Sequence, residues 1–208
     1  MTRRTRSSAR WLKEHFSDPF VQRARSEGWR SRAVFKLESI DRREKLLKSG
    51  HCCLDLGAAP GAWSQYARRR VGPKGRVIAT DILPMQALAG VEFVQGDFRE
   101  PGVFERVRAL APRGQVDVLL SDLAPNLSGV DAIDQPRSME LAELALQMAA
   151  AVLKPGGGAL IKVFQGAGFQ ELVQAARGEF ARVKLVKPPA SRTRSSEMYL
   201  LAMQFRLV

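Results

Sequence analysis

The stretch Cys53-Leu-Asp-Leu-Gly-Ala-Ala-Pro-Gly-Ala-Trp63 decides the fold, because an apolar run gives way to a glycine-framed loop and then to a helical pattern. A strand that ends in such a loop brings its backbone close to a ligand at the carboxyl edge of a parallel sheet. Gly57 and Gly61 permit positive φ angles or close approach, since neither carries a Cβ. The stretch therefore predicts a ligand-binding turn. A tight turn of small residues chosen only for packing is the alternative.

This loop lacks the features of a phosphate-binding site. It contains no Gly-x-x-x-x-Gly-Lys-Ser/Thr pattern, and the spacing of Gly57 and Gly61 differs from the dinucleotide pattern Gly-x-Gly-x-x-Gly. Pro60 removes one further amide donor from the turn. The loop thus favours a nucleoside ligand without phosphates, with S-adenosylmethionine as the candidate, and it disfavours a nicotinamide dehydrogenase.

Composition narrows the class of protein. The 208 residues suit one well-cored domain, and the formal net charge is +12. Such a charge favours a polyanionic partner, most often nucleic acid, over an anionic membrane surface. No apolar run approaches the roughly 18 residues that cross a bilayer. The adjacent Cys52 and Cys53 have no partners at metal-ligand spacing, which indicates a reducing, cytoplasmic compartment and no metal site.

Positive charge gathers in two segments that lie far apart in the sequence. Residues 1–50 hold 14 Lys or Arg against 6 Asp or Glu, and Arg182–Arg194 holds 5 Lys or Arg with no acid. Helices are predicted over Ala9–Phe16 and Ala33–Leu47. We expect the two segments to form one surface that follows a phosphate backbone, although two separate solvated faces are the alternative. We expect the Arg- and Ser-rich start to be a basic RNA-binding arm, with an organellar transit peptide as the alternative.

From residue 51 onward, short apolar runs alternate with helix-length segments, which is typical of a doubly wound α/β sheet. The predicted strands are Cys52–Leu56, Arg76–Thr80, Val91–Gln95, Val116–Ser121, Ala159–Phe164, Arg182–Val186 and Tyr199–Phe205. The predicted helices are Ala62–Val71, Pro101–Leu110, Pro136–Leu153 and Phe169–Phe180. The connection from Lys187 to Met198 has no room for a crossover helix, so the last strand is predicted to be antiparallel. The pattern predicts a Rossmann-like S-adenosylmethionine methyltransferase fold with a seven-stranded, mostly parallel sheet.

Three acids follow apolar runs at the predicted carboxyl ends of strands, where ligand groups of an open α/β sheet gather. Asp81 lies 24 residues after Gly57, near the spacing at which an acid contacts ribose hydroxyls. Asp97 is positioned to accept the exocyclic amine of adenine. Asp122 is expected to bridge cofactor and acceptor. A single acid of this kind is usually a helix cap or turn residue, but three beside a glycine loop favour a nucleoside site.

Several segments together resemble the FtsJ-type ribosomal RNA 2′-O-methyltransferases, from about Arg10 to the last strand. They are Ser31-Arg-Ala-Val-Phe-Lys-Leu37, Asp55-Leu-Gly-Ala-Ala-Pro-Gly-Ala-Trp-Ser-Gln65, Ser121-Asp-Leu-Ala-Pro-Asn126, Ile161-Lys-Val-Phe-Gln-Gly166 and Ser191-Arg-Thr-Arg-Ser-Ser-Glu-Met-Tyr199. The resemblance implies a methyltransferase domain over residues 31–208, preceded by a basic extension over 1–30 with a short helix. One departure is Ala62, where many relatives have a second glycine. Because alanine is also small, we expect cofactor binding to be retained.

The resemblance further implies a catalytic tetrad of Lys36, Asp122, Lys162 and Glu197. It also implies cofactor contacts from Gly57, Gly61, Trp63, Asp81, Asp97 and Asp122. Lys162 supports this assignment independently, because it stands in mid-strand, a poor place for a lysine unless it faces a polar site. An ordinary salt bridge on the sheet is the alternative for Lys162 and Glu197. Our hypothesis is that Lys162 deprotonates or steers a ribose 2′-hydroxyl.

The implied activity is S-adenosylmethionine-dependent methylation of a uridine ribose in the peptidyl-transferase A-loop of large-subunit (23S) ribosomal RNA, on the assembled subunit. Transfer RNA or a messenger cap is the alternative acceptor, and a catalytically silent RNA-binding factor is the alternative class. Aromatic residues make up only 7% of the chain, which favours recognition of RNA by phosphates and shape over base stacking. We expect a monomer, and the loop Leu123–Arg137 is predicted to act as a lid over the acceptor.

Overall fold

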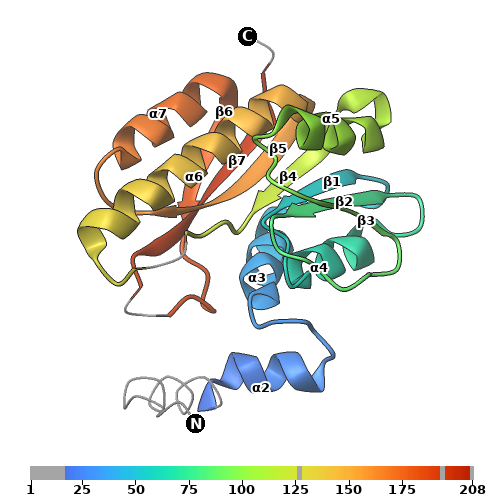
Figure 1. Ribbon diagram of the computed structural model, residues 1–208, viewed down its shortest axis with the longest axis horizontal. Coiled ribbons are helices and arrows are strands. Elements are labelled where there is room, and N and C mark those ends of the chain that lie inside the picture. The colour runs from blue at the N-terminus through green and yellow to red at the C-terminus, as the bar shows by residue number, and fades with distance from the viewer. Residues whose placement is uncertain (1–16, 126–127, 193–194, 207–208) are drawn as a thin grey trace.

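The computed structural model describes residues 17–125, 128–192 and 195–206 and shows a three-layer α/β arrangement (Figure 1). The helices are α2 (Pro19–Ser26), α3 (Val34–Glu44), α4 (Ala62–Val71), α5 (Pro101–Leu110), α6 (Asp131–Val152) and α7 (Phe169–Glu179). The strands are β1 (Cys52–Leu56), β2 (Arg76–Asp81), β3 (Val91–Gln95), β4 (Val116–Ser121), β5 (Leu153–Phe164), β6 (Phe180–Val186) and β7 (Glu197–Phe205). No helix in these ranges is long and apolar enough to cross a membrane.

The described residues form one seven-stranded sheet in the order β3-β2-β1-β4-β5-β7-β6. Strands β1 to β5 pair in parallel, whereas β7 lies antiparallel between β5 and β6. This confirms the predicted fold class and the antiparallel last strand. The placement of β7 matters for the site, because its register sets Tyr199 opposite Lys162 and Glu197 opposite Phe164.

Two helical layers cover the two faces of the sheet, each over its own hydrophobic core (Figure 1). Helices α5, α6 and α7 pack on one face, and α3 and α4 pack on the other, with α2 beside α3. The layers differ in charge: by sequence, α2–α4 carry eight Lys or Arg and three Asp or Glu, whereas α5–α7 carry four and seven. The net positive charge of the helices therefore lies on one side of the sheet.

Helix α2 was absent from the sequence prediction, although its start carries a readable signal. Asp18 is the N-cap, with its carboxylate accepting the Phe20 amide at 2.9 Å, and Pro19 occupies the first helical position. An acid followed by proline at this position is a typical helix start. Val21 and Ala24 are buried, so α2 is part of the folded body. The predicted helix over Ala9–Phe16 lies outside the described residues.

The structure corrects two predicted boundaries around the longest helix. Helix α6 begins at Asp131 and continues through Pro136, because the Asp134 carboxylate accepts both the Ser128 and Gly129 amides and so ties down the preceding turn. The predicted lid over Leu123–Arg137 is therefore partly helix. At the other end, Leu153 is the first residue of β5 and not the last of the helix, since it pairs with Val116 across a bulge.

Candidate active site

Two neighbouring cavities open at the carboxyl edge of the sheet, and both are lined by Ala124 after β4. The first, of about 340 Å³, lies over β1, β2 and β3 and is called the cofactor cavity here. Its lining residues are Gly57, Thr80, Asp81, Ile82, Gly96, Asp97, Phe98, Arg99, Leu123, Ala124, Pro125, Arg137, Glu140 and Leu141. The second, of about 320 Å³, lies over β5 and β7 and is called the acceptor cavity. Its lining residues are Ser31, Arg32, Ala33, Lys36, Ala124, Lys162, Phe164, Ala190, Arg192, Ser195 and Glu197.

The glycine loop requires both of its glycines. Gly57 has a φ of 70° and Gly61 a φ of 104°, a region that favours glycine. A Cβ on Gly57 would lie 2.5 Å from Leu123 Cδ2, so the glycine leaves room for the Leu123 side chain that follows β4. Gly57 lines the cofactor cavity, whereas Gly61 is the N-cap of α4 and is not among the lining residues.

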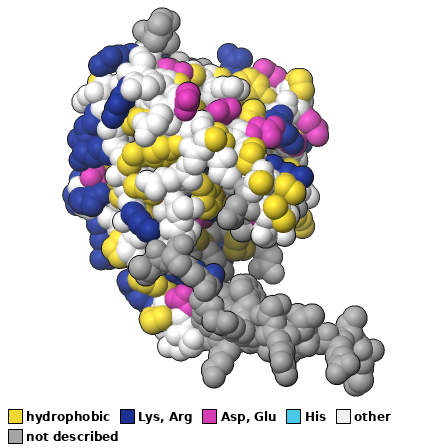
Figure 2. Space-filling view, turned by 90° about the vertical axis from the view of Figure 1, so that its left-hand side faces the viewer, with side chains coloured by type: hydrophobic (Ala, Val, Ile, Leu, Met, Phe, Trp, Pro, Cys, Tyr) yellow, Lys and Arg dark blue, Asp and Glu magenta, His cyan; other side chains and the backbone are white. Residues whose placement is uncertain are grey.

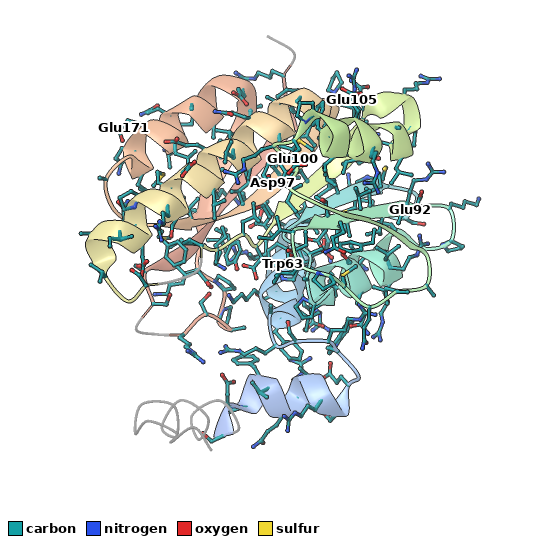
Figure 3. All side chains as sticks on the ribbon, in the orientation of Figure 1. Trp63, Glu92, Asp97, Glu100, Glu105 and Glu171 are labelled. Atoms are coloured by element: carbon teal, nitrogen blue, oxygen red, sulfur yellow. The ribbon has the colours of Figure 1, made fainter. Side chains whose placement is uncertain are left out.

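The strand-end acids Asp81 and Asp97 both line the cofactor cavity. The Asp81 carboxylate accepts the Ala59 amide at 2.9 Å and the Leu83 amide at 2.8 Å, so it holds the loops after β1 and β2 together. Asp97, labelled in Figure 3, accepts hydrogen bonds from the Arg99 guanidinium through both carboxylate oxygens, each at 2.9 Å. This hydrogen bonding lowers the pKa of Asp97 and keeps it an acceptor. The cavity therefore presents carboxylates suited to ribose hydroxyls and to an amine.

Trp63 lies outside both cavities, although the sequence placed it among the cofactor contacts (Figure 3). Its buried ring packs against Tyr199 with centroids 5.6 Å apart, and its indole N–H donates to the Ala33 carbonyl at 2.8 Å. Trp63 therefore connects Ala33, which lines the acceptor cavity, to Tyr199 on β7.

All four residues of the predicted tetrad come together in the acceptor cavity or at its edge. Lys162 Nζ lies 3.2 Å from Asp122 Oδ1 and 3.9 Å from Glu197 Oε2. Lys36 Nζ donates to the same Glu197 oxygen at 2.8 Å. The Lys162 side chain is only 9% exposed, so its ammonium group is held among these carboxylates and not in bulk water. Two lysines and two acids thus alternate around one small space.

Tyr199 is a site residue that the sequence reasoning missed. It is fully buried, and its hydroxyl donates to Asp122 Oδ1 at 2.5 Å, the same oxygen that faces Lys162. Burial raises the pKa of Tyr199 well above its usual value, so the phenol stays protonated and remains a donor. The available signal was its position in β7, two residues after Glu197, which gives both side chains the same face of the sheet.

Asp55 is a second missed residue, and it lies beneath the glycine loop. Its carboxyl is 1% exposed and accepts the Ser64 hydroxyl at 2.6 Å. Burial is the main cause that raises the pKa of Asp55 to about 7, and the neighbouring Asp122 and Asp81 raise it further. The sequence showed this acid inside an apolar strand, which is a signal for a buried polar group.

The two basic segments meet in the folded chain. Glu44, at the end of α3, accepts from Lys184 Nζ at 3.1 Å and also contacts Arg182 on the edge strand β6. The exposed Arg42 and Arg43 precede it on α3. In Figure 2 most Lys and Arg side chains lie along the left edge of the view, and most Asp and Glu side chains lie in its upper and right part. The β6 cations Arg182 and Lys184 therefore lie beside the end of α3, where Glu44 pairs with both, and these cations together with Arg42 and Arg43 are called the basic surface here.

A sheet of this order, with an inserted antiparallel β7 and a carboxylate-lined cavity beside a glycine loop, is typical of the Rossmann-like methyltransferase fold. Residues 29–205 match the family model described as FtsJ-like methyltransferase. The chain belongs to this family, and its cofactor is S-adenosylmethionine.

Named relatives resemble the chain along nearly its whole length. It is 55% identical over 204 residues to ribosomal RNA large subunit methyltransferase E of Legionella pneumophila (strain Corby), covering 98% of this chain and 99% of that protein. It is 56% identical over 201 residues to the protein of the same name from Xanthomonas oryzae pv. oryzae (strain PXO99A), covering 97% and 96%. A crystal structure from Plasmodium falciparum, assigned as a ribosomal RNA methyltransferase, aligns with a TM-score of 0.75 at 28% identity, covering 85% of this chain and 98% of that one.

Proposed function

We propose that this protein methylates the 2′-oxygen of a uridine ribose in the peptidyl-transferase A-loop of large-subunit ribosomal RNA, on the assembled subunit. The observation that carries the proposal is the Lys162 ammonium group, held 3.2 Å from Asp122 and 3.9 Å from Glu197 in a cavity that adjoins the cofactor cavity. The relatives named for methylation of large-subunit ribosomal RNA supply the class of acceptor.

In the cofactor cavity, Asp81 would bind the ribose hydroxyls of S-adenosylmethionine and Asp97 would accept its adenine amine. When bound there, S-adenosylmethionine would supply an electrophilic methyl group. The space for the acceptor lies on the far side of Ala124, which lines both cavities. Asp122 follows β4 at this junction, so its carboxylate is placed to orient both partners.

In the acceptor cavity, Lys162 would steer the 2′-hydroxyl through its ammonium group or, as the neutral amine, accept the proton that this hydroxyl loses as its oxygen takes the methyl group. Asp122 and Glu197 hold the Lys162 side chain in place through the contacts at 3.2 Å and 3.9 Å. Lys36 positions the ribose, and Glu197 fixes Lys36 at 2.8 Å. A ribose 2′-hydroxyl is the group that distinguishes RNA from DNA, so a site built to engage it selects RNA.

The RNA backbone follows the basic surface that leads away from the acceptor cavity along β6 and the end of α3. Arg192, in the connection between β6 and β7, lines that cavity, and Lys184 and Arg182 lie on β6 itself. Lys and Arg contacts to phosphates give affinity without sequence preference, so they position the RNA and do not choose the nucleotide. We further propose that the protein acts as a monomer in the cytoplasm.

The test is mass mapping of ribose methylation on ribosomal RNA from cells with and without this protein. Loss of one 2′-O-methyluridine in the A-loop is the expected result, together with its restoration when purified protein and S-adenosylmethionine are added to the unmethylated subunits. An unchanged ribosomal RNA pattern with loss of a methyl group from transfer RNA would favour the alternative acceptor. Failure to bind S-adenosylmethionine in calorimetry would favour a silent RNA-binding factor.

A further inference from the structure

Arg30, in the segment between α2 and α3, contacts both loops that frame the cofactor cavity. Its Nη1 donates to the Pro60 carbonyl at 3.1 Å and to the Gln86 carbonyl at 2.8 Å, and its Nη2 donates to the Ala87 carbonyl at 2.8 Å. Pro60 belongs to the glycine loop after β1, whereas Gln86 and Ala87 belong to the loop after β2. One guanidinium group thus joins two loops that are far apart in sequence from Arg30 itself.

The space for this guanidinium is created by Gly61. A Cβ at Gly61 would lie 2.8 Å from Arg30 Nη1 and 2.8 Å from Met85 Sδ. Gly61 therefore leaves room beside the glycine loop for both Arg30 and Met85. This gives a physical role to a glycine that does not itself line the cofactor cavity.

The backbone of the segment that carries Arg30 is also fixed by hydrogen bonds. Its backbone amide donates to Gln65 Oε1 at 3.1 Å, and Gln65 Nε2 donates to the Gly28 carbonyl at 2.9 Å. The three residues that follow Arg30, Ser31–Ala33, line the acceptor cavity. Arg30 therefore connects the cofactor loops to the wall on which the acceptor rests.

We propose that Arg30 is a positioning residue for the cofactor: its guanidinium holds the loops after β1 and β2 at the separation that S-adenosylmethionine requires. Asp81, which lines the cavity, joins the same loops through the Ala59 and Leu83 amides, so two residues link these loops. The planar fork of arginine suits three carbonyl acceptors, whereas a lysine ammonium is a compact point charge. The inference rests on the proposed placement of the cofactor at these loops.

The test compares Arg30→Met, Arg30→Lys and the control Arg76→Met, whose native guanidinium donates to the Leu110 carbonyl at the other end of β2. Calorimetric titration with S-adenosylmethionine, without RNA, is the first measurement. Arg30→Met is expected to weaken binding by about tenfold, the effect of losing one charge-assisted hydrogen bond, and Arg30→Lys by about fivefold, because a lysine can replace only part of the three hydrogen bonds. Arg76→Met is expected to stay within about twofold of the native protein.

Kinetics separate positioning from a general loss of structure. Arg30→Met is expected to raise KM for S-adenosylmethionine while kcat at saturation stays within about threefold, because the tetrad is untouched. Unchanged cofactor affinity with weakened RNA binding would overturn the proposal and make Arg30 a phosphate contact. Asp81→Asn separates the role of Arg30 from the placement of the cofactor. If Asp81→Asn weakens cofactor binding and Arg30→Met does not, only the role of Arg30 is wrong. If neither variant weakens binding, the placement of the cofactor is wrong too.

Discussion

The cofactor cavity and the acceptor cavity share Ala124 but are assembled in different ways. Most residues of the cofactor cavity follow directly after β1, β2, β3 and β4, so each comes from the end of a strand in the same parallel set. The acceptor cavity draws on the start of α3, on β5 and on the β6–β7 connection. Its central hydrogen bond, from Lys36 to Glu197, joins residues 161 positions apart.

This difference assigns different tasks to the two halves of the site. The cofactor half is held by hydrogen bonds between side chains and the backbone of its loops, as at Asp81 and Arg30. The acceptor half is held by charged side chains that contact one another, as at Lys162 and Asp122. We therefore expect changes in the first half to alter cofactor affinity and changes in the second to alter the rate of methyl transfer.

The largest effect is expected from Lys162→Met, which removes the central cation of the acceptor half. Methylation at saturating substrates should fall by about 100- to 10 000-fold, the usual contribution of a proton-transferring group. S-adenosylmethionine affinity should stay within about twofold, because Lys162 does not line the cofactor cavity. Single-turnover methylation assays together with calorimetry measure both values. Near-native methylation by this variant would remove Lys162 from the mechanism.

The opposite pattern is expected from Asp81→Asn in the cofactor half. A hydrogen bond to a charged group is worth about 1.5–3 kcal/mol, so the dissociation constant for S-adenosylmethionine should rise by about 10- to 100-fold. The maximal rate at saturating cofactor should change little. Glu92→Gln, at a half-exposed site on β3, is the matched control and should bind normally (Figure 3). A lower maximal rate with unchanged affinity would contradict the division between the halves.

The buried Asp55 allows a test by pH, because no salt bridge within the described residues pairs it with a cation as Lys162 pairs with Asp122. The pKa of Asp55 is about 7 in the folded protein and its ordinary value is 3.8, so the folded state binds the proton more tightly. The Asp55 contribution to stability is therefore present at low pH and is lost as pH rises from about 4 to 7. Asp55→Asn should reduce the loss of stability between pH 5 and pH 8 by about 3 kcal/mol.

Urea unfolding of both proteins at the two pH values measures this difference. The asparagine keeps an oxygen that can accept the Ser64 hydroxyl, so the local hydrogen bond is retained. An identical pH dependence in both proteins would show that Asp55 is ionised at no cost in the native state.

The smallest effect is expected from neutralising the basic surface with Arg182→Gln and Lys184→Gln together. Glu44 already balances part of this charge, so RNA affinity should fall by only about fivefold near 0.1 M salt. The slope of log affinity against log salt should become shallower by about 1 to 2, the value for two lost phosphate contacts. The control is Arg106→Gln with Arg108→Gln on α5, in the opposite helical layer. Equal losses from both pairs would mean that RNA does not follow β6.

Local sequence patterns predicted most strands well, and several boundaries match the structure, as at Cys52–Leu56 and Val91–Gln95. The errors lie where contacts from elsewhere decide the boundary. Helix α6 extends before Pro136 because Asp134 accepts amides from the preceding turn, and β5 begins at Leu153 because it pairs with Val116. Helix α2 was missed although Asp18 and Pro19 form a recognisable start.

The sequence by itself determined the parallel sheet, the glycine loop and the acids at strand ends, because strand periodicity and turn chemistry act over a few residues. It also identified Lys36, Asp122, Lys162 and Glu197 as a set through family resemblance. Only the tertiary structure decided that Tyr199 donates to Asp122, that Trp63 donates to the Ala33 carbonyl and that Arg30 joins the two cofactor loops. These contacts join distant segments, so packing decides them and local sequence patterns do not contain them.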